Sequence, residues 1–176
     1  SAADRGKPSL LVSLDLSAAF DTISHSILLS RLQSSFGTSG PALAWLKSYL
    51  SDRTQIIRIG SSSSSVYAID SGVPQKGSVL GPILFSVYVS PIGSIASQHN
   101  LLHQQYADDA QFFIELSSPT YHPDIHQLEL GLQHLHNWLC ANGLCLNPDK
   151  SDAILFGTSK RLQSFSHVTQ VNVAGC

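Results

Sequence analysis

One hairpin-like segment constrains the fold of this chain more than any other. The segments His103–Tyr106 and Gln111–Ile114 have the residues of two short strands, and four residues separate them. Asp108 and Asp109 lie in that connection, where short aspartate side chains favour a tight turn. We therefore predict a strand, a turn with both aspartates at its tip, and a second strand, which commits the chain to a sheet with antiparallel strands.

Segments on both sides of this hairpin predict its partners. Leu10–Leu14 is a short apolar run that stops at Asp15, and its length and composition fit a buried strand. From Asp124 onward, apolar residues recur at spacings of three and four, which indicates an amphipathic helix. Asn142–Gly143 supplies the C-terminal stop of that helix. Ala153–Phe156 is the last short strand that we predict.

The middle of the chain predicts three helices and a second hairpin. Thr22 or Ser24 can cap the first helix, and Pro41 suits the first turn of the second. The other predicted elements are strands at Gln55–Ile59 and Val66–Ile69, a mobile serine connection at Ser61–Ser65, and a buried helix at Ser78–Val89 that ends near Pro91. This mixture predicts an α+β fold in which helices cover one face of a sheet.

Composition limits the classes of protein to consider. The 176 residues suffice for one domain, and 43% hydrophobic with only 12% charged residues excludes a disordered chain. No run of about 18 apolar residues is free of polar breaks, so we expect no membrane span. The three cysteines are too few for a disulfide framework and fit a reducing, intracellular compartment, nuclear or cytoplasmic. The oligomeric state stays open.

Acidic residues stand where two of the predicted strands end. If these strands are neighbours in one sheet, Asp15 and Asp108 meet, and carboxylates about 4 Å apart repel by roughly 4 kcal/mol at an effective dielectric of about 20. Mg²⁺ relieves such repulsion and keeps coordination positions for substrate phosphates. Simpler interpretations remain open at this point, because paired aspartates are common in turns and Asp15 can cap a helix.

An ordered set of motifs narrows these alternatives. The chain resembles the reverse transcriptase of non-LTR (LINE-type) retrotransposons, especially the Jockey-like branch, from Leu10 to about Gly157. The resemblance is carried by Leu14–Asp21, Gly72–Gln75, Gly77–Pro82 and Tyr106–Asp109 in that order, with His25, Trp45–Arg53 and Leu146–Ser151 in agreement.

The resemblance implies a catalytic role for four residues. Asp15 and Asp108 would be the two metal-binding aspartates of a polymerase palm, and Asp109 the adjacent acidic partner. Two Mg²⁺ or Mn²⁺ ions would be the cofactors. Lys150 matches a basic residue that donates a proton to pyrophosphate, although a solvated lysine is the competing interpretation.

The resemblance also implies contacts with nucleotide and template. Phe20 falls at an aromatic gate that leaves no room for a 2′-hydroxyl, with a core phenylalanine as the alternative. The small residues Ser17 and Ala18 would let the backbone face the triphosphate. Gln75 and Gly77 belong to a loop that would lie under the nascent base pair, where glycine permits close approach. An ordinary turn before a helix is the alternative for that loop.

For the fold, the resemblance implies an α+β domain with a polymerase palm-like antiparallel sheet, helices packed on one face, incomplete fingers and no thumb. We expect a loose N-terminal end at residues 1–9 and a reverse transcriptase palm segment at residues 10–157. Residues 158–176 form a C-terminal segment, for which a further strand is one interpretation.

The implied function is that of a fragment of an RNA-directed DNA polymerase, which transfers a nucleotide from a dNTP to a primer 3′-hydroxyl. Its partners would be an RNA template, a DNA primer and the dNTP, with no membrane. A palm of the group II intron maturase type is a second enzyme interpretation, and Ser78–Pro82 favours the LINE type.

A different class of function also stays open, a catalytically dead transposon relic that acts as a binding module. Lys76 is inserted between Gln75 and Gly77, where the family runs directly from Gly-Val-Pro-Gln into Gly-Ser. Ten basic residues against twelve acidic ones are also few for neutralising nucleic-acid phosphates. Whether the isolated chain is active is therefore left open by the sequence.

Overall fold

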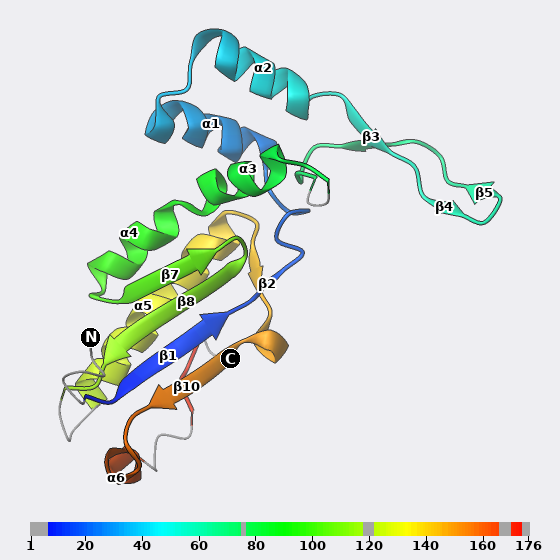
Figure 1. Ribbon diagram of the computed structural model, residues 1–176. Helices are drawn as coiled ribbons and strands as arrows, with labels where there is room; N and C mark the ends of the chain where they lie inside the picture. The colour runs from blue at the N-terminus through cyan, green and yellow to red at the C-terminus, as the bar shows by residue number, and fades with distance from the viewer. Residues whose placement is uncertain (1–6, 75–76, 118–121, 166–169, 174–176) are drawn as a thin grey trace. The chain divides into compact units, whose positions relative to one another are not determined.

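A computed structural model describes residues 7–74, 77–117, 122–165 and 170–173 (Figure 1). The chain divides into two compact units, one made of Ser1–Ser17 with Ser90–Cys176 and the other of Ala18–Val89. Each unit is described by itself.

The first unit is built on a four-stranded antiparallel sheet. The order of the strands in the sheet differs from their order in the chain. The first strand of the chain lies in the interior of the sheet, between two strands from the C-terminal half of the chain (Figure 1). This confirms the predicted α+β fold with an antiparallel sheet. The strands run in the order β10 (Asp152–Phe156), β1 (Ser9–Leu14), β8 (Asp109–Glu115) and β7 (Leu102–Tyr106).

The predicted hairpin is confirmed with one correction. Its turn consists of Ala107 and Asp108 alone, and Asp109 is the first residue of β8, paired with Tyr106. Ala107 has a φ of 52°, the left-handed conformation that two-residue hairpin turns require. The shorter turn extends the ladder by one pair, which the residue types alone did not indicate.

One face of this sheet forms the core of the first unit. Leu10, Val12 and Leu14 of β1 are buried at alternate positions, and Phe112 of β8 lies opposite Val12. Two helices supply the other half of this core, α5 (His122–Ala141) packing against β8 and α4 (Pro91–Gln98) packing against α5 and β7. The buried residues of α5 include Leu128, Leu132, Leu135 and Leu139, which confirms the predicted amphipathic helix.

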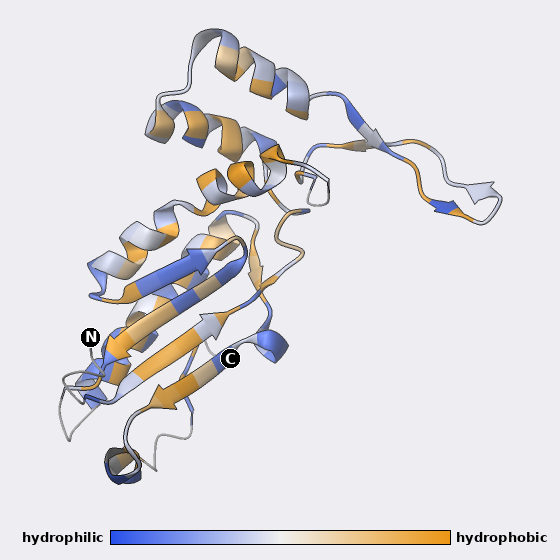
Figure 2. Cartoon of the chain, in the orientation of Figure 1, coloured by the Kyte–Doolittle hydropathy of each residue, from blue (hydrophilic) through white to orange (hydrophobic). Residues whose placement is uncertain are grey.

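The opposite face of the sheet is more open. Leu102, Phe113, Leu11 and Ile154 pair across the four strands, and Leu102 is 66% exposed. Figure 2 shows β1 and β10 as mainly hydrophobic and β7 as mainly hydrophilic. The alternation along β1 therefore separates a buried face from one that carries accessible apolar groups.

Short elements complete the first unit. β2 (Leu16–Ser17) pairs with β9 (Cys145–Leu146), and a 3₁₀ turn, η1 (Pro148–Lys150), leads into β10. Within residues 158–176, where a strand was one interpretation, the described residues instead contain α6 (Ser159–Leu162) and the 3₁₀ turn η2 (Gln163–Phe165).

The second unit contains three helices, α1 (His25–Phe36), α2 (Gly40–Leu50) and α3 (Leu80–Val89). Ser24 caps α1, since its hydroxyl accepts a hydrogen bond from the backbone of Ile27. Gly37 ends α1 in the left-handed conformation. Pro41 lies in the first turn of α2, as the sequence predicts.

A hairpin arm extends between α2 and α3 in the second unit. Its first side is interrupted, so the continuous strand predicted at Gln55–Ile59 is wrong, whereas the strand predicted at Val66–Ile69 is confirmed except for its first residue. The serine run is also structured, because Ser64 exchanges backbone and hydroxyl hydrogen bonds with Ile57. The arm consists of β3 (Arg53–Gln55) paired with β6 (Tyr67–Ile69) and of β4 (Arg58–Ile59) paired with β5 (Ser62–Ser63).

Pro91 starts a helix rather than only ending one. The sequence prediction stopped the apolar helix near Pro91, whereas α4 begins there with the proline in its first turn, where a missing N–H costs nothing. The 19-residue stretch Leu80–Gln98 that spans α3 and α4 has the length and composition to cross a membrane, which the sequence prediction did not expect. It is 44% buried inside the protein, and the core helices of proteins that do not span a membrane share these properties, so this is weak evidence for a span.

Candidate functional site

The acidic residues of the first unit are brought together by strand register. The last pair in the ladder between β1 and β8 joins Leu14 to Ala110. Asp15 follows Leu14 and Asp109 precedes Ala110, so continuing the register puts these two aspartates opposite each other. Asp108 is the next residue, in the hairpin turn. Residues far apart in the chain therefore meet at one end of the sheet.

Alternation along the strands places Asp15 and Asp109 on the open face of the sheet. Leu14 and Ala110 are buried on the helix-covered face, so their neighbours in sequence point to the opposite face. Asp15 is half-buried and Asp109 is exposed. Tyr106, paired with Asp109, is 83% exposed. The acidic end of the sheet is thus accessible to a solute.

The backbone of Asp15 is held on both sides by one turn. Its carbonyl accepts a hydrogen bond from the N–H of Asn147 at 2.9 Å, and its N–H donates to the hydroxyl of Ser151 at 3.3 Å. The Ser151 hydroxyl in turn donates to the carbonyl of Asn147 at 2.8 Å. These contacts fix the position of Asp15 beyond the end of β1.

Sequence analysis did not single out Asn147 and Ser151 as positioning residues. The sequence signal for both residues was that the segment Leu146–Ser151 agrees with the resemblance to reverse transcriptases. Lys150 precedes Ser151 in the same turn and is exposed. Ser17 lies in β2, opposite Cys145. Lys150 is therefore adjacent in sequence to Ser151, whose hydroxyl binds the N–H of Asp15.

The donor set at this end of the sheet fits a magnesium-type site of low protein coordination. Among the described residues, no group of three or more His, Cys, Asp or Glu side chains could hold a metal ion by itself. Carboxylate oxygens are nevertheless the hard ligands that Mg²⁺ prefers, and protein sites for Mg²⁺ commonly supply one or two carboxylates and leave the rest to water and substrate phosphates. Asp15 with Asp108 or Asp109 satisfies that smaller requirement.

In the second unit, Phe20 is part of the core. Its ring is 5% exposed and stacks on Phe85 of α3, with the ring centroids 4.6 Å apart. This is the packing expected of the alternative interpretation, a core phenylalanine. Its predicted role as a gate for the incoming sugar is still a prediction. Ala18, by contrast, is exposed and has a φ of 48°, so the backbone turns sharply there.

The glycine-rich loop is fastened to the segment that follows Ala18. The N–H of Val73 donates to the carbonyl of Phe20, and the N–H of Gly72 donates to the carbonyl of Ile23, each at 2.8 Å. The ring nitrogen Nε2 of His25 lies 2.8 Å from the carbonyl oxygen of Gly72. We call this set of three contacts the loop clamp.

Glycine is required at position 72 on two grounds. Its φ is +82°, and a Cβ there would lie 2.9 Å from the carbonyl oxygen of Asp21. Gly77 also has a positive φ, of 70°, and open space around it. Gln75 and the inserted Lys76 lie outside the described residues.

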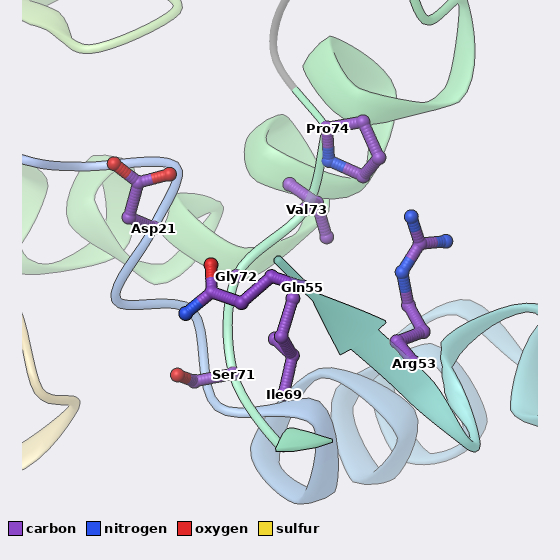
Figure 3. A pocket seen from close by; sticks show the side chains of 8 residues that line it. All are labelled: Asp21, Arg53, Gln55, Ile69, Ser71, Gly72, Val73 and Pro74. Atoms are coloured by element: carbon purple, nitrogen blue, oxygen red, sulfur yellow. The ribbon is translucent and has the colours of Figure 1, made fainter. Parts of the chain in front are cut away.

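A pocket of about 430 Å³ lies beside this loop, within the second unit (Figure 3). One wall is the segment Ser71–Pro74, and another is the hairpin arm. Figure 3 shows Arg53 and Gln55 extending from β3, with Asp21 on the opposite side of the pocket from Arg53. The sequence analysis assigned no role to Arg53 or Gln55.

A buried tyrosine beneath α1 has a perturbed titration. Burial raises the pKa of Tyr88 above its ordinary value, opposed by a backbone hydrogen bond from Ser24 and by the charge of Arg31. The guanidinium of Arg31 lies 5.1 Å from the centroid of the Tyr88 ring, donates to its carbonyl, and has its own pKa lowered by burial. These groups join α1 to α3 and have no part in the acidic site.

An antiparallel sheet with aspartates at the ends of two paired strands, and a glycine-rich loop between those strands in the chain, is the arrangement of a polymerase palm. A family model described as reverse transcriptase (RNA-dependent DNA polymerase) matches residues 1–176, and the chain belongs to that family. Members of this family copy RNA into DNA and use divalent metal ions.

Curated relatives agree with the family and with the branch that the sequence motifs indicated. The chain is 34% identical over 145 residues to a probable RNA-directed DNA polymerase from transposon BS, and 38% identical over 104 residues to that from mobile element jockey, both of Drosophila melanogaster. The matches cover 80% and 54% of this chain, but only 16% and 11% of those proteins. The chain thus corresponds to a segment of the reverse transcriptase domain of such retrotransposon polymerases.

Solved structures show the same fold in distant proteins. Telomerase from Candida tropicalis, in complex with a fragment of telomeric RNA, superposes with a TM-score of 0.65 at 14% identity, over 87% of this chain and 27% of that one. Telomerase from Candida albicans gives a TM-score of 0.65 at 15% identity, over 87% and 28%. At such identities the likeness shows the palm-containing fold alone.

Proposed function

We propose that this chain is the catalytic palm of an RNA-directed DNA polymerase, with Asp15 and Asp108 as its metal-binding aspartates and Asp109 as their acidic neighbour. The observation that supports it is the register of β1 and β8, which puts Asp15 opposite Asp109 and next to the turn that holds Asp108. The substrates in this proposal are an RNA template, a DNA primer and a dNTP.

In the proposed reaction, the primer 3′-oxygen forms a bond to the α-phosphorus of the dNTP, and the bond to the β-phosphate oxygen breaks to release pyrophosphate. Two bound Mg²⁺ ions would lower the pKa of the attacking hydroxyl and neutralise charge on the leaving group. Asp15 and Asp108 would hold these cations by their carboxylate oxygens. Asn147 and Ser151 keep Asp15 in place, since they bind its backbone on both sides.

Lys150 is the proposed proton donor to the leaving pyrophosphate. It is exposed in η1, one residue before Ser151, and an ammonium group carries a transferable proton. Ser17 and Ala18 have small side chains, which would leave their backbone accessible to a triphosphate. Gln75 and Gly77 are the proposed contacts to the template and nascent base pair.

Primer extension on an RNA template with Mg²⁺ tests this function. We expect the wild-type chain to extend the primer and Asp108→Asn to lose at least about a hundredfold in rate, since it removes charge stabilisation at the reacting phosphate. Asp152→Asn is the matched control, because Asp152 is an exposed aspartate on the neighbouring strand β10. Equal rates for wild type and Asp108→Asn would refute the proposal.

A metal titration gives an independent readout. Mg²⁺ or Mn²⁺ that binds only the folded protein raises the melting temperature by mass action. We expect this rise in wild type and in Asp152→Asn, and a smaller rise in Asp15→Asn. If Asp15→Asn responds to metal as wild type does, the two aspartates do not form the proposed site.

A further inference from the structure

We propose that a small pocket between the C-terminal end of α5 and the turn η1 is a covalent binding site for an apolar α,β-unsaturated aldehyde, with Cys140 as the nucleophile. All the residues that line this pocket belong to the first unit. The inference goes beyond the proposed function and does not depend on it, because the reaction needs neither a metal ion nor a nucleic acid.

The size and the walls of the pocket select a small, uncharged occupant. Its volume is about 130 Å³. Leu146, Pro148 and Val173 supply apolar walls, and Cys140 and Cys145 line it as well. A cavity of about 150 Å³ with apolar walls holds one benzene molecule, so this pocket suits a ligand of about six carbon atoms. It is too small for a nucleotide or for a peptide thiol.

The two thiols of the pocket differ in one respect. Cys140 and Cys145 are both exposed and free. Sγ of Cys140 lies 3.4 Å from Nε2 of His136, one helical turn away on the same face of α5. Nδ1 of that ring is buried and has no hydrogen-bond partner in the described part of the chain, so the ring's polar contact there is the one with the sulfur. Among the described residues, no imidazole contacts Cys145 in this way.

A thiol beside an imidazole can add to an activated double bond. The thiolate is the reactive form of cysteine, and histidine is the commonest general base in proteins. In the proposed step, Nε2 of His136 accepts the thiol proton while the sulfur of Cys140 forms a bond to the β-carbon of the aldehyde. The electrons of the broken π bond form an enolate, and the imidazolium returns the proton to the α-carbon. No group leaves, so the product is a thioether that keeps its aldehyde.

The polar group at the floor of the pocket is already satisfied by the protein. The hydroxyl of Ser151, which also lines the pocket, accepts from the N–H of Asp15 at 3.3 Å and donates to the carbonyl of Asn147 at 2.8 Å. A polar ligand therefore gains little from it, and an occupant is held by apolar contact with Leu146 and Pro148. This favours an apolar electrophile over a charged one.

Mass spectrometry after reaction with trans-2-hexenal tests the inference. In a Cys176→Ser background only Cys140 and Cys145 remain as thiols, and peptide mapping assigns each adduct. We expect Cys140 to react at least about tenfold faster than Cys145, since a positioned general base contributes about a hundredfold or more. Equal rates at these two exposed thiols would overturn the inference.

A substitution of the imidazole tests its role. His136→Ala should slow the reaction of Cys140 about tenfold and leave that of Cys145 unchanged. His126→Ala is the matched control, because it removes an exposed histidine of the same helix, and it should change neither rate. Circular dichroism checks that both variants keep the fold. An undiminished rate at Cys140 in His136→Ala would refute its assignment as the activated thiol.

The pocket itself is tested with a shorter aldehyde. Acrolein has the same reacting carbons as trans-2-hexenal but lacks its propyl tail, and each buried CH₂ group strengthens binding about fourfold. The ratio of the hexenal rate to the acrolein rate at Cys140 should therefore exceed the same ratio for N-acetylcysteine by about tenfold or more. Equal ratios would mean that the pocket does not hold the tail, and would overturn the inference.

Labelling and primer extension are separate readouts. Selective labelling of Cys140 in a chain that extends no primer supports this site and counts against the polymerase proposal. Primer extension by a chain whose Cys140 and Cys145 react alike refutes this site and leaves the polymerase proposal standing.

Discussion

The two units hold their functional segments by different means. In the first, six consecutive residue pairs between β1 and β8 set the position of Asp15 relative to Asp109, over a buried core. In the second, the loop clamp holds Gly72 and Val73 with three hydrogen bonds to residues 20–25. The acidic residues therefore depend on a long ladder, and the loop depends on a few local contacts.

This difference predicts different tolerances. A register shift by one residue in β1 would turn Asp15 toward the buried face. The ladder between β1 and β8 therefore forms in one register or not at all, and we call it all or none in this sense. The loop can open locally at a lower free energy, because few bonds hold it. One tryptophan lies in each unit, Trp138 in α5 and Trp45 in α2, so fluorescence can follow the two units separately.

The largest effect should come from the core under the ladder. Phe112 is 1% exposed and pairs with Val12, so Phe112→Ala should lower the free energy of unfolding by about 3–5 kcal/mol. Urea unfolding followed by Trp138 measures this. Phe113→Ala, on the opposite face of β8, should cost clearly less because Phe113 is only half-buried. Similar losses for the two variants would contradict the division into buried and open faces.

A smaller effect is expected where backbone approaches backbone in the second unit. A Cβ on Gly81 would meet the carbonyl oxygen of Pro74, so Gly81→Ala forces α3 and the loop apart, at about 1–3 kcal/mol. Gly93→Ala is the control, because its Cβ would meet the ring of the exposed His103, which can rotate away. Thermal unfolding in a Trp138→Phe background measures the first variant through Trp45.

If Gly93→Ala proves as harmful as Gly81→Ala, the distinction between a backbone and a side-chain obstacle fails for this protein. If only Gly81→Ala lowers the stability, the obstacle is the backbone carbonyl of Pro74. Either result sharpens the contrast between a ladder that is all or none and a loop that can be displaced.

Local patterns predicted the elements whose signals are periodic or chemical. The spacing of Leu128, Leu132, Leu135 and Leu139 gave α5, and the aspartates in a short connection gave the β7–β8 hairpin. The sequence predicts Pro91 only as the end of a helix. Proline breaks a helix from inside but also begins one, and the local sequence does not distinguish these two positions. The strand β5 (Ser62–Ser63) was not predicted, because serine is typical of loops and its pairing with Arg58 and Ile59 has no local signal.

Long-range contacts had no local signal. Asn147 and Ser151 contact Asp15 across most of the chain, and nothing in their own neighbourhood indicates that partner. The aspartates were chosen from chemistry and family resemblance, and their pairing across β1 and β8 required a register that sequence alone leaves undetermined. The Arg53 pocket was missed for the same reason, since β3 and the loop meet only in the folded unit.

We expect the His25 contact of the loop clamp to contribute little to the stability of the second unit. His25→Ala removes one hydrogen bond to the Gly72 carbonyl and should lower the stability of the second unit by about 1 kcal/mol. His126→Ala, which changes an exposed histidine of α5, is the control and should leave stability unchanged. A loss above about 3 kcal/mol for His25→Ala would mean that the loop is no more displaceable than the ladder.

The smallest effect concerns pH and again separates the units. Burial raises the pKa of Tyr88, so above about pH 10 the unfolded chain loses the phenol proton while the folded chain keeps it. The stability of the second unit is therefore unaffected by Tyr88 at neutral pH and falls as pH rises toward the folded pKa. Arg31 acts in the opposite sense, because burial lowers its pKa.

Urea midpoints measured from about pH 8 to about pH 11 should show this alkaline loss through Trp45 and not through Trp138. Tyr88→Phe should flatten the curve, whereas Tyr67→Phe, on the exposed arm, should not. An unchanged alkaline limb in Tyr88→Phe would show that the phenol titrates alike in both states. A limb of equal steepness at Trp138 would show that the two units unfold together, and that ladder and loop share one stability.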